Sequence, residues 1–337
     1  MKAFNLSDIE LTKYLFFTGK GGVGKTSIAC ATAVGLADKG KKILLISTDP
    51  ASNLQDVFDQ PLNGHGTAIS EVPGLTVVNL DPEQAAAEYR ESVIAPFRGK
   101  LPESVIQNME EQLSGSCTVE IAAFNEFSDF ITDVNEAKEY DHIIFDTAPT
   151  GHTLRMLQLP SAWSTFISES THGASCLGQL SGLEERKGIY KQAVDTLSDT
   201  SATRLVLVSR PEIAPLKEAA RSSHELQLLG IKNQLLVING VLQQLDEADN
   251  VSQQLHDRQQ KALQSMPIAL SEYPMYSIPL RSYNLSNIAN IRRMLYSDSI
   301  TNEISYQPIT DSKSIDELVN DLYTSGKRVV FTMGKGG

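Results

Sequence analysis

The sequence predicts an α/β protein with a mostly parallel, doubly wound sheet, and three observations lead to this fold class. Short apolar runs alternate with helical stretches along most of the 337 residues. A glycine-rich loop separates the first of these runs from the first helical stretch. Polar residues follow the runs, as they do at the ligand-binding edge of such sheets; they are Thr18, Thr48, Asp49, Asp146, Ser209 and Asn239. The expected strands are Leu15–Phe17, Ile43–Ile46, Leu75–Leu80, Ile143–Phe145, Leu205–Val208, Leu235–Ile238 and Met275–Ile278.

Two stretches, about residues 82–138 and 153–197, lack strand signals and have helical apolar spacing instead. Clear examples of this spacing are Ala85–Val93 and Val119–Phe130. We expect these stretches to form a helical layer over the carboxyl edge of the sheet.

Composition excludes several classes of protein. The net charge of −12 and the lack of basic clusters with interleaved aromatic residues argue against nucleic acid as a partner. No apolar run approaches a membrane span of about 18 residues, and the first residues lack a signal-peptide core. Cys30, Cys117 and Cys176 are far apart, which excludes a zinc ribbon and disfavours a disulfide framework. We therefore expect a cytoplasmic protein with free thiols.

The glycine-rich loop fits the phosphate-binding pattern G-x-x-x-x-G-K-[ST]. Its residues, with the one that follows, are Gly19, Lys20, Gly21, Gly22, Val23, Gly24, Lys25, Thr26 and Ser27. Glycines let successive N–H groups and a helix N-terminus point at one anion, while the lysine reaches the β- and γ-phosphates and the threonine binds Mg²⁺. The alternative is a glycine-rich turn without a ligand, which the strand before the loop and the helix after it disfavour.

Lys20 is unusual, because an ordinary phosphate-binding loop needs no particular residue at its second position. A second lysine there indicates a charge supplied to the transferring phosphoryl group, across an interface. A cation that arrives in trans contributes about 10³ to 10⁵ in rate. The alternative is an ordinary solvated surface lysine.

Asp49 and Asp146 each follow an apolar run. Phosphoryl transfer needs one carboxylate near Mg²⁺ and one group that positions the attacking water, and these two residues meet both needs. Taken singly, an Asp-Pro pair such as Asp49-Pro50 is more often a turn or a helix cap.

Three motifs together, the loop with its extra lysine, S-T-D-P-A-S-N at 47–53 and D-T-A-P-T-G-H-T at 146–153, give a close resemblance. The chain resembles the deviant-Walker P-loop ATPases that include the arsenical pump-driving ATPases and the tail-anchored protein targeting factors. The resemblance extends from about Tyr14 to about Leu295.

This resemblance implies ATP and Mg²⁺ as cofactors and two nucleotide domains that face each other. It implies that Lys20 crosses to the opposite site and that Lys25 holds the β- and γ-phosphates. Thr26 then binds Mg²⁺, Asp49 orients the hydrolytic water and Asp146 senses Mg²⁺ at the second switch.

The same resemblance implies roles for residues outside the phosphate site. Asn53 belongs to the first switch, Asn239 resembles an adenine-reading asparagine, and Pro279 resembles a residue that packs on the base. His152 follows the second switch motif, where it links the switch to the cargo site or is an ordinary hydrogen-bonded histidine.

Cys117 and Cys176 fall in the expected helical layer, each beside small residues that leave a thiol accessible. A free cysteine is usually a small buried hydrophobe, which is how we interpret Cys30. The resemblance implies that Cys117 and Cys176 bind As(III) or Sb(III), because soft thiolates select soft ions. A third thiolate would come from a second homologous half.

Residues 329–337 align without gaps to residues 14–22, so both end in G-K-G-G. We interpret this as a tandem duplication; coincidence in a glycine-ended tail is the alternative. The expected organisation is a nucleotide-binding domain over 1–296, which includes the helical metalloid-binding layer, a polar linker over 297–327, and the start of a second repeat over 328–337.

The resulting hypothesis is an ATPase that couples ATP hydrolysis to arsenite and antimonite extrusion as the soluble subunit of an efflux pump. Its expected partners are a permease that holds it at the inner membrane, a cytosolic arsenic metallochaperone, and a second homologous half or a homodimer mate. The alternative is an ATPase that carries tail-anchored membrane proteins. That function calls for a Met-rich apolar groove and a C-x-x-C zinc site, and the sequence shows neither.

Overall fold

The computed structural model describes residues 1–49, 54–147, 181–243, 248–295, 314–326 and 328–331. The chain divides into two compact units, Met1–Tyr296 and Ser297–Gly337. The first contains the sheet and the motifs, and the second contains one described helix.

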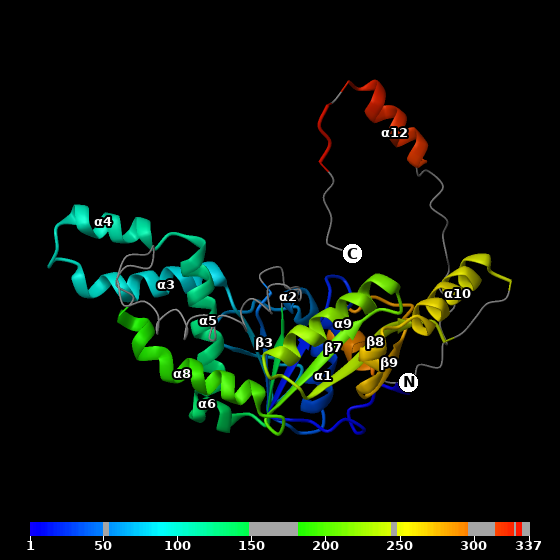
Figure 1. The fold of residues 1–337 in the computed structure, drawn as a ribbon, viewed down its shortest axis with the longest axis horizontal. Helices are drawn as coiled ribbons and strands as arrows, with labels where there is room; N and C mark the ends of the chain where they lie inside the picture. Colours follow the sequence, from blue (N-terminus) through cyan, green and yellow to red (C-terminus); the bar gives the residue numbers. More distant parts are fainter. Residues whose placement is uncertain (50–53, 148–180, 244–247, 296–313, 327, 332–337) are drawn as a thin grey trace. The chain divides into compact units, whose positions relative to one another are not determined.

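The first unit contains a sheet with nine described strands, in the order β1-β9-β8-β7-β2-β6-β3-β5-β4. Figure 1 shows β7, β8 and β9 side by side in this sheet. Every neighbouring pair is parallel except β4 and β5. The strands are β1 Lys2–Ala3, β2 Tyr14–Thr18, β3 Ile43–Ser47, β4 Thr67–Ala68, β5 Leu75–Asn79, β6 His142–Asp146, β7 Thr203–Ser209, β8 Gln234–Val241 and β9 Met275–Pro279. All seven expected strands are confirmed. The two-residue edge strands β1 and β4 are too short to leave a periodic signal.

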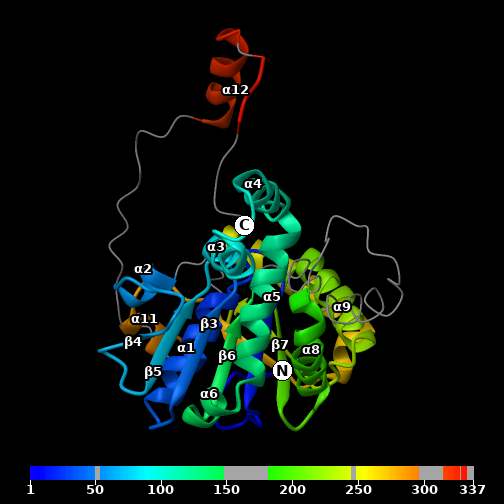
Figure 2. The same ribbon diagram turned by 90° about the vertical axis from the view of Figure 1, so that its left-hand side faces the viewer.

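Helices cover both faces of the sheet, which confirms the doubly wound α/β class (Figures 1 and 2). Those of the first unit are α1 Lys25–Ala37, α2 Leu54–Phe58, α3 Pro82–Ile94, α4 Glu103–Gln112, α5 Ser116–Thr132, α6 Val134–Glu139, α8 Ser181–Ser198, α9 Ile213–Leu228, α10 Asn250–Gln264 and α11 Ile288–Met294. Short 3₁₀ turns cover Ala95–Phe97 and Ile268–Glu272. The helices α1, α2 and α11 pack on one face, and α5, α8, α9 and α10 pack on the other.

The register of the central strands aligns their carboxyl ends. On β2, Phe17 lies opposite Asp146 of β6, and on β3, Ser47 lies opposite the same aspartate. All residues of β2 and β3 are buried, as expected for parallel strands with both faces covered. The residues that follow these strands therefore meet at one edge of the sheet.

The helix α1 is buried along almost its whole length between the sheet and α11. Its sequence is rich in alanine and carries apolar residues on all sides, so it suits the interior of a three-layer fold. Cys30 is fully buried there, and burial raises the pKa of its thiol. The interpretation of Cys30 as a core residue is confirmed.

An aromatic cluster joins the sheet to α5 on the opposite face. The rings of Phe16 and Phe145 stack with their centroids 4.5 Å apart, and the Phe127 ring of α5 meets Phe145 at 5.2 Å. The Tyr14 hydroxyl donates to the Ile131 carbonyl at 2.9 Å. Packing of α5 against these rings explains the helical apolar spacing expected over 119–130. The helices α3, α4, α5 and α8 form a group to one side of the sheet (Figure 1).

The second unit contains α12, Ile315–Thr324, which begins with a capping box between Ser314 and Glu317. The polar composition of 297–327 did not lead us to expect this helix. The apolar run Val329–Phe331 forms no strand in the structure, although the alignment with residues 14–22 predicts one. A strand needs a neighbour to pair with, and the described part of this unit offers only a helix.

Within the described parts of the chain, no helix combines the length and apolar content needed to cross a bilayer.

We expect Phe145→Ala to lower the free energy of unfolding by about 3 to 5 kcal/mol, because it leaves a cavity among stacked rings. Urea denaturation measures the loss. Phe97→Ala is the matched control: that ring is 40% exposed, so the same change is expected to cost less than about 1 kcal/mol. Similar losses in both variants would contradict this description of the core.

Candidate nucleotide-binding site

The loop over residues 19–24 connects the end of β2 to the start of α1. Gly22 and Gly24 have left-handed backbone angles, with φ of 77° and 92°. No side chain caps the first turn of α1, and that turn carries no acidic residue. The N–H groups at this helix N-terminus are therefore available to an anion.

The loop packs tightly against the ends of β7 and β8. A Cβ atom at Gly19 would lie 2.2 Å from the Val208 carbonyl oxygen, and one at Gly24 would lie 2.3 Å from Nδ2 of Asn239. The Asn239 amide also donates to the Val23 carbonyl at 2.9 Å. Glycine is thus required at both positions by close approach as well as by backbone angle.

Lys25 is buried at the base of the loop, and its Nζ lies 3.4 Å from the Lys20 carbonyl oxygen. Burial lowers the pKa of Lys25, while the nearby charges of Asp146 and Asp49 raise it. Lys20 presents an exposed side chain on the same loop. The two lysines therefore have different environments, one inside the site and one outside it.

Asp146 ends β6 and is fully buried. Neither of its carboxylate oxygens has a hydrogen-bond partner of normal geometry among the described residues. Burial raises the pKa of Asp146 to about 7; the Thr26 hydroxyl and the Lys25 charge lower it, and the Asp49 charge raises it. A buried carboxylate without a partner is costly unless a cation joins it.

Asp146 and Thr26 fit a Mg²⁺ ion. This ion prefers oxygen ligands and is usually held by one or two carboxylates together with substrate phosphates and water. The described residues contain no group of three or more His, Cys, Asp or Glu side chains that could form an all-protein cage. The residues present therefore suit an ion that arrives with a phosphate ligand.

Two further hydroxyls lie at this edge without a role in the sequence analysis. Thr18 and Thr48 are 0% and 7% exposed, and neither hydroxyl has a hydrogen-bond partner in the described structure. The Thr147 hydroxyl, by contrast, donates to the Phe17 carbonyl at 2.8 Å. The sequence signals these threonines only by their positions after strands. That position does not distinguish a hydroxyl that makes a hydrogen bond from one that makes none.

The structure brings together the loop, Asp49, Asp146 and Asn239, and it places Pro279 at the end of β9, next to β8. Asn53, His152 and Cys176 lie outside the described residues, as does the side chain of Cys117, whose backbone begins α5. The functional roles of all the candidate residues, those that the structure brings together included, stay predictions.

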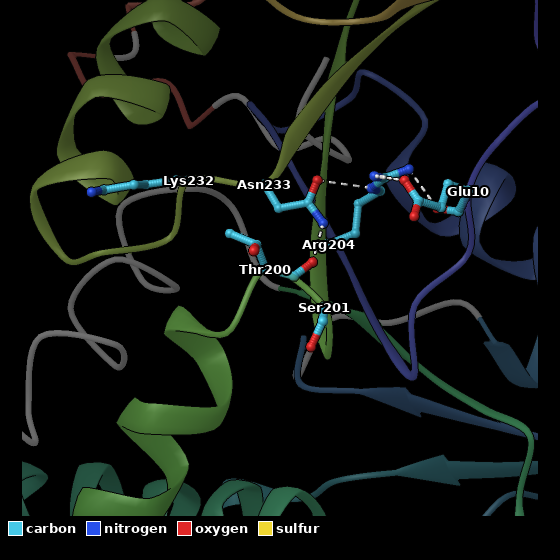
Figure 3. Close-up of a pocket in the computed structure, with 6 residues that line it drawn as sticks. All are labelled: Glu10, Thr200, Ser201, Arg204, Lys232 and Asn233. Atoms are coloured by element: carbon cyan, nitrogen blue, oxygen red, sulfur yellow. Dashed lines mark hydrogen bonds and ion pairs between the residues drawn. The ribbon is translucent and has the colours of Figure 1, made fainter.

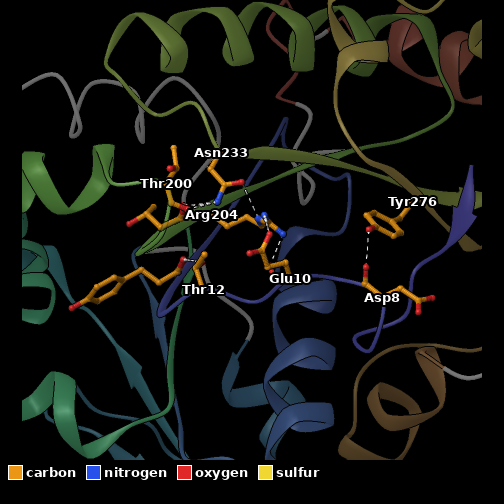
Figure 4. Close-up of polar contacts among 9 residues, drawn as sticks. Asp8, Glu10, Thr12, Thr200, Arg204, Asn233 and Tyr276 are labelled. Atoms are coloured by element: carbon orange, nitrogen blue, oxygen red, sulfur yellow. Dashed lines mark hydrogen bonds and ion pairs between the residues drawn. The ribbon is translucent and has the colours of Figure 1, made fainter.

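A hollow of about 400 Å³ lies at the opposite edge of the sheet, where β7 and β8 begin (Figure 3). Its lining residues are Glu10, Thr200, Ser201, Arg204, Lys232 and Asn233. The Arg204 guanidinium donates to Asn233 at 3.0 Å and to the Glu10 carboxylate at 3.2 Å, so its donors are engaged within the protein (Figure 4). These contacts hold the N-terminal segment against the sheet.

The buried carboxylate gives a pH dependence whose sign follows from its pKa. The folded-state pKa of Asp146 is about 7 and its ordinary value is 3.8, so between these values the unfolded chain loses this proton and the folded chain keeps it. Without nucleotide and Mg²⁺, this group should lower stability as pH rises from about 4 to about 7. Asp146→Asn should raise the free energy of unfolding at pH 8 by about 2 to 4 kcal/mol, measured by urea denaturation.

Asp141→Asn is the matched control, because this carboxylate should change the free energy of unfolding with pH in the opposite direction. The Lys42 N–H donates to this carboxylate at 2.8 Å and lowers its pKa, so its contribution is present at neutral pH and is lost as pH falls. The prediction fails if Asp146→Asn and the unmodified chain lose stability equally between pH 5 and pH 8.

Comparison with known proteins places this geometry in a family. The family model for anion-transporting ATPases matches residues 12–297. An arsenical pump-driving ATPase from Acidiphilium multivorum is 48% identical over 335 residues, and one from Escherichia coli is 47% identical over 332. In each case the match covers 97% of this chain and 57% of the relative. An ATPase GET3 from Komagataella phaffii is 28% identical over 306 residues, which cover 84% of this chain and 89% of that protein.

The chain thus spans little more than half the length of the two bacterial relatives. The match covers the glycine-rich loop, Asp49, Asp146 and the end of β8. The chain belongs to the anion-transporting ATPase family.

Proposed function

We propose that this chain binds Mg²⁺–ATP at the carboxyl edge of its sheet, hydrolyses it, and uses that reaction to drive arsenite and antimonite export. The observation that carries the proposal is the buried carboxylate of Asp146, without a normal hydrogen-bond partner in the described structure, beside Thr26 and Lys25. Thr26 and Lys25 belong to a complete phosphate-binding loop, and the family and the names of the relatives agree with this chemistry.

The loop binds the triphosphate through its backbone N–H groups and through Lys25. The lowered pKa of Lys25 reflects burial, and a phosphate beside it would favour the charged form. The present contact between Nζ and the Lys20 carbonyl is weak at 3.4 Å, so the lysine gives up little when it turns to a phosphate.

Thr26 and Asp146 hold the metal ion. When bound, Mg²⁺ neutralises charge on the β- and γ-phosphates. Asp146 has to be ionised in this role, and a cation beside it lowers its pKa and removes the cost of burying the charge. Ligand binding is thus coupled to the ionisation of this group.

Asp49 orients the attacking water from the end of β3. It is only partly buried, and its charge acts on both Lys25 and Asp146, which places it within electrostatic reach of the phosphate site. Asn53, four residues later, belongs to the same switch in this proposal. Proton acceptance or water positioning at this point is what phosphoryl transfer to water needs.

Lys20 acts on the opposite nucleotide site. Its exposed side chain lies outside its own buried site, which supports a role across an interface. The partner in this arrangement is a second homologous half or a second copy of the chain. The repeated G-K-G-G at 334–337 and the greater length of the relatives favour a second half.

The proposal of metalloid export is supported by the two cysteines and by the names of the relatives. In this proposal Cys117 and Cys176 bind As(III) or Sb(III) as thiolates, and a third thiolate from a second half completes the site. His152 links this site to the second switch. A membrane permease receives the cargo and holds the protein at the inner membrane, and a cytosolic metallochaperone delivers the metalloid.

A carrier of tail-anchored membrane helices is the second candidate. Similarity to the ATPase GET3 of Komagataella phaffii favours it, as do the exposed apolar side chains of Phe97, Leu101 and Val105 beside and on α4. It ranks second because that relative is only 28% identical and because the sequence has no C-x-x-C. Stable retention of an apolar helix peptide by the purified protein would favour the carrier over the pump subunit.

The two loop lysines should separate binding from catalysis. Lys25→Ala removes a phosphate contact, so we expect Mg²⁺–ATP affinity to fall at least about tenfold. Lys20→Ala should leave that affinity within about twofold and lower kcat by about 10³ or more, because the charge acts in the transition state. Titration calorimetry and phosphate release measure the two effects.

Lys39→Ala is the control, because this lysine is exposed beyond the end of α1 and its ammonium group donates to the Ser7 hydroxyl at 3.1 Å. Equal losses of binding in the Lys20 and Lys25 variants would contradict the division of roles.

Arsenite or antimonite should stimulate ATP hydrolysis in a chain that contains both homologous halves. We expect Cys117→Ser and Cys176→Ser each to abolish most of this stimulation while the basal rate stays unchanged. Cys30→Ala is the matched control, since the Cys30 thiol is buried in α1 and its raised pKa disfavours the thiolate. Unchanged stimulation in all three variants would exclude the two cysteines as ligands.

A further inference from the structure

Asn239 makes a contact that its expected role does not require. It lies near the end of β8, and its Nδ2 donates a hydrogen bond to the Val23 carbonyl at 2.9 Å. Val23 is the fifth residue of the phosphate-binding loop and is 1% exposed. The side chain therefore connects the second half of the sheet directly to the loop, across 216 positions of sequence.

The glycine residues of the loop allow this close contact with Asn239. Gly24 caps α1 with a φ of 92°, and a Cβ atom there would lie 2.3 Å from Nδ2 of Asn239. Gly19 is equally close to β7, since its Cβ would lie 2.2 Å from the Val208 carbonyl oxygen. Both ends of the loop are therefore pressed against β7 and β8, and Asn239 supplies the side-chain hydrogen bond.

The contact also fixes which way the Asn239 amide points. A carbonyl oxygen accepts but does not donate, so the NH₂ group must face Val23 and the amide oxygen must face away. No described residue donates to that oxygen. Of the two ends of this amide, one is used by the loop and the other is left for a ligand.

We propose that Asn239 is a positioning residue that braces the phosphate-binding loop through the Val23 carbonyl. The brace fixes the backbone between Gly22 and Lys25, so that its N–H groups converge on one anion before the ligand arrives. Preorganised donors bind an anion more tightly than donors that must be ordered on binding.

This inference rests on the proposed nucleotide site and deepens it. The free amide oxygen suits the 6-amino group of adenine, the contact that the family resemblance implies for this residue. One side chain then contacts the base and holds the loop that binds the phosphates. If Asn239 only contacts the base, its substitution should weaken the binding of nucleotides alone. If it braces the loop, its substitution should also weaken the binding of an anion that has no base.

Mg²⁺–tripolyphosphate distinguishes the two roles, because it carries the phosphates and no base. We expect Asn239→Asp, which replaces the donor with an oxygen, and Asn239→Ala each to weaken tripolyphosphate binding about fivefold to tenfold. Mg²⁺–ATP binding should weaken by at least as much. Titration calorimetry on the full chain gives both affinities, and urea denaturation without ligand shows that each variant is folded.

Asn233→Asp is the matched control at the other end of the same strand. The Asn233 amide also donates to backbone carbonyls, those of Thr200 and Thr203 at 2.8 and 3.0 Å, but at the edge away from the loop (Figures 3 and 4). Its tripolyphosphate affinity should equal that of the unmodified chain. An equal loss in this variant would mean that the effect is general destabilisation, and would overturn the brace.

Two other outcomes are decisive. If both Asn239 variants bind tripolyphosphate normally and only ATP binding weakens, Asn239 reads the base and does not brace the loop. If the unmodified chain binds neither ligand, the proposed nucleotide site itself is wrong, and the brace fails with it. The neutral Asn239→Ala variant decides between these outcomes, because Asn239→Asp also adds a negative charge beside the loop.

Discussion

The parallel register of β2, β6 and β3 is the constraint on which the site depends. Because Asp146 lies opposite both Phe17 and Ser47, the residues after three strands meet at one edge. The loop follows β2, Asp49 follows β3, and Asp146 ends β6 itself. A shift of one residue in any of these pairs would turn the Asp146 carboxylate to the other face of the sheet. Register therefore decides whether the motifs form one site or three separate turns.

The core stabilises a site that is costly without its ligand. Burial raises the pKa of Asp146 more than Thr26 and Lys25 lower it, so without a ligand this carboxylate favours unfolding at neutral pH. The aromatic cluster of Phe16, Phe127 and Phe145 on one face and the buried α1 on the other offset it. Destabilising groups of this kind are common at binding sites, where the ligand offsets their cost in free energy.

Comparison of the two edges of the sheet shows that hydrogen-bond partners, and not residue types alone, distinguish a binding site from a structural network. Asn233 immediately precedes β8 and Asn239 lies near its carboxyl end, and each side chain donates to a backbone carbonyl. At the amino edge Asn233 also accepts from Arg204, which is paired with Glu10, so that network is satisfied within the protein. At the carboxyl edge the oxygen of Asn239 has no described donor, and Asp146 and two threonine hydroxyls also lack partners there. Several unsatisfied polar groups of the described residues therefore lie together at the edge that carries the loop.

The sequence by itself determined the seven long strands, the loop, the helical stretch over 82–138 and the edge residues, because periodicity and glycine spacing are local signals. It did not predict α12, β1 or β4, and the alignment led to a strand over 329–331 that the structure lacks. Only the tertiary structure decided the pKa of Asp146 and the contact from Asn239 to Val23. Both depend on burial and on neighbours far apart in the chain, and no local pattern encodes which distant groups pack together.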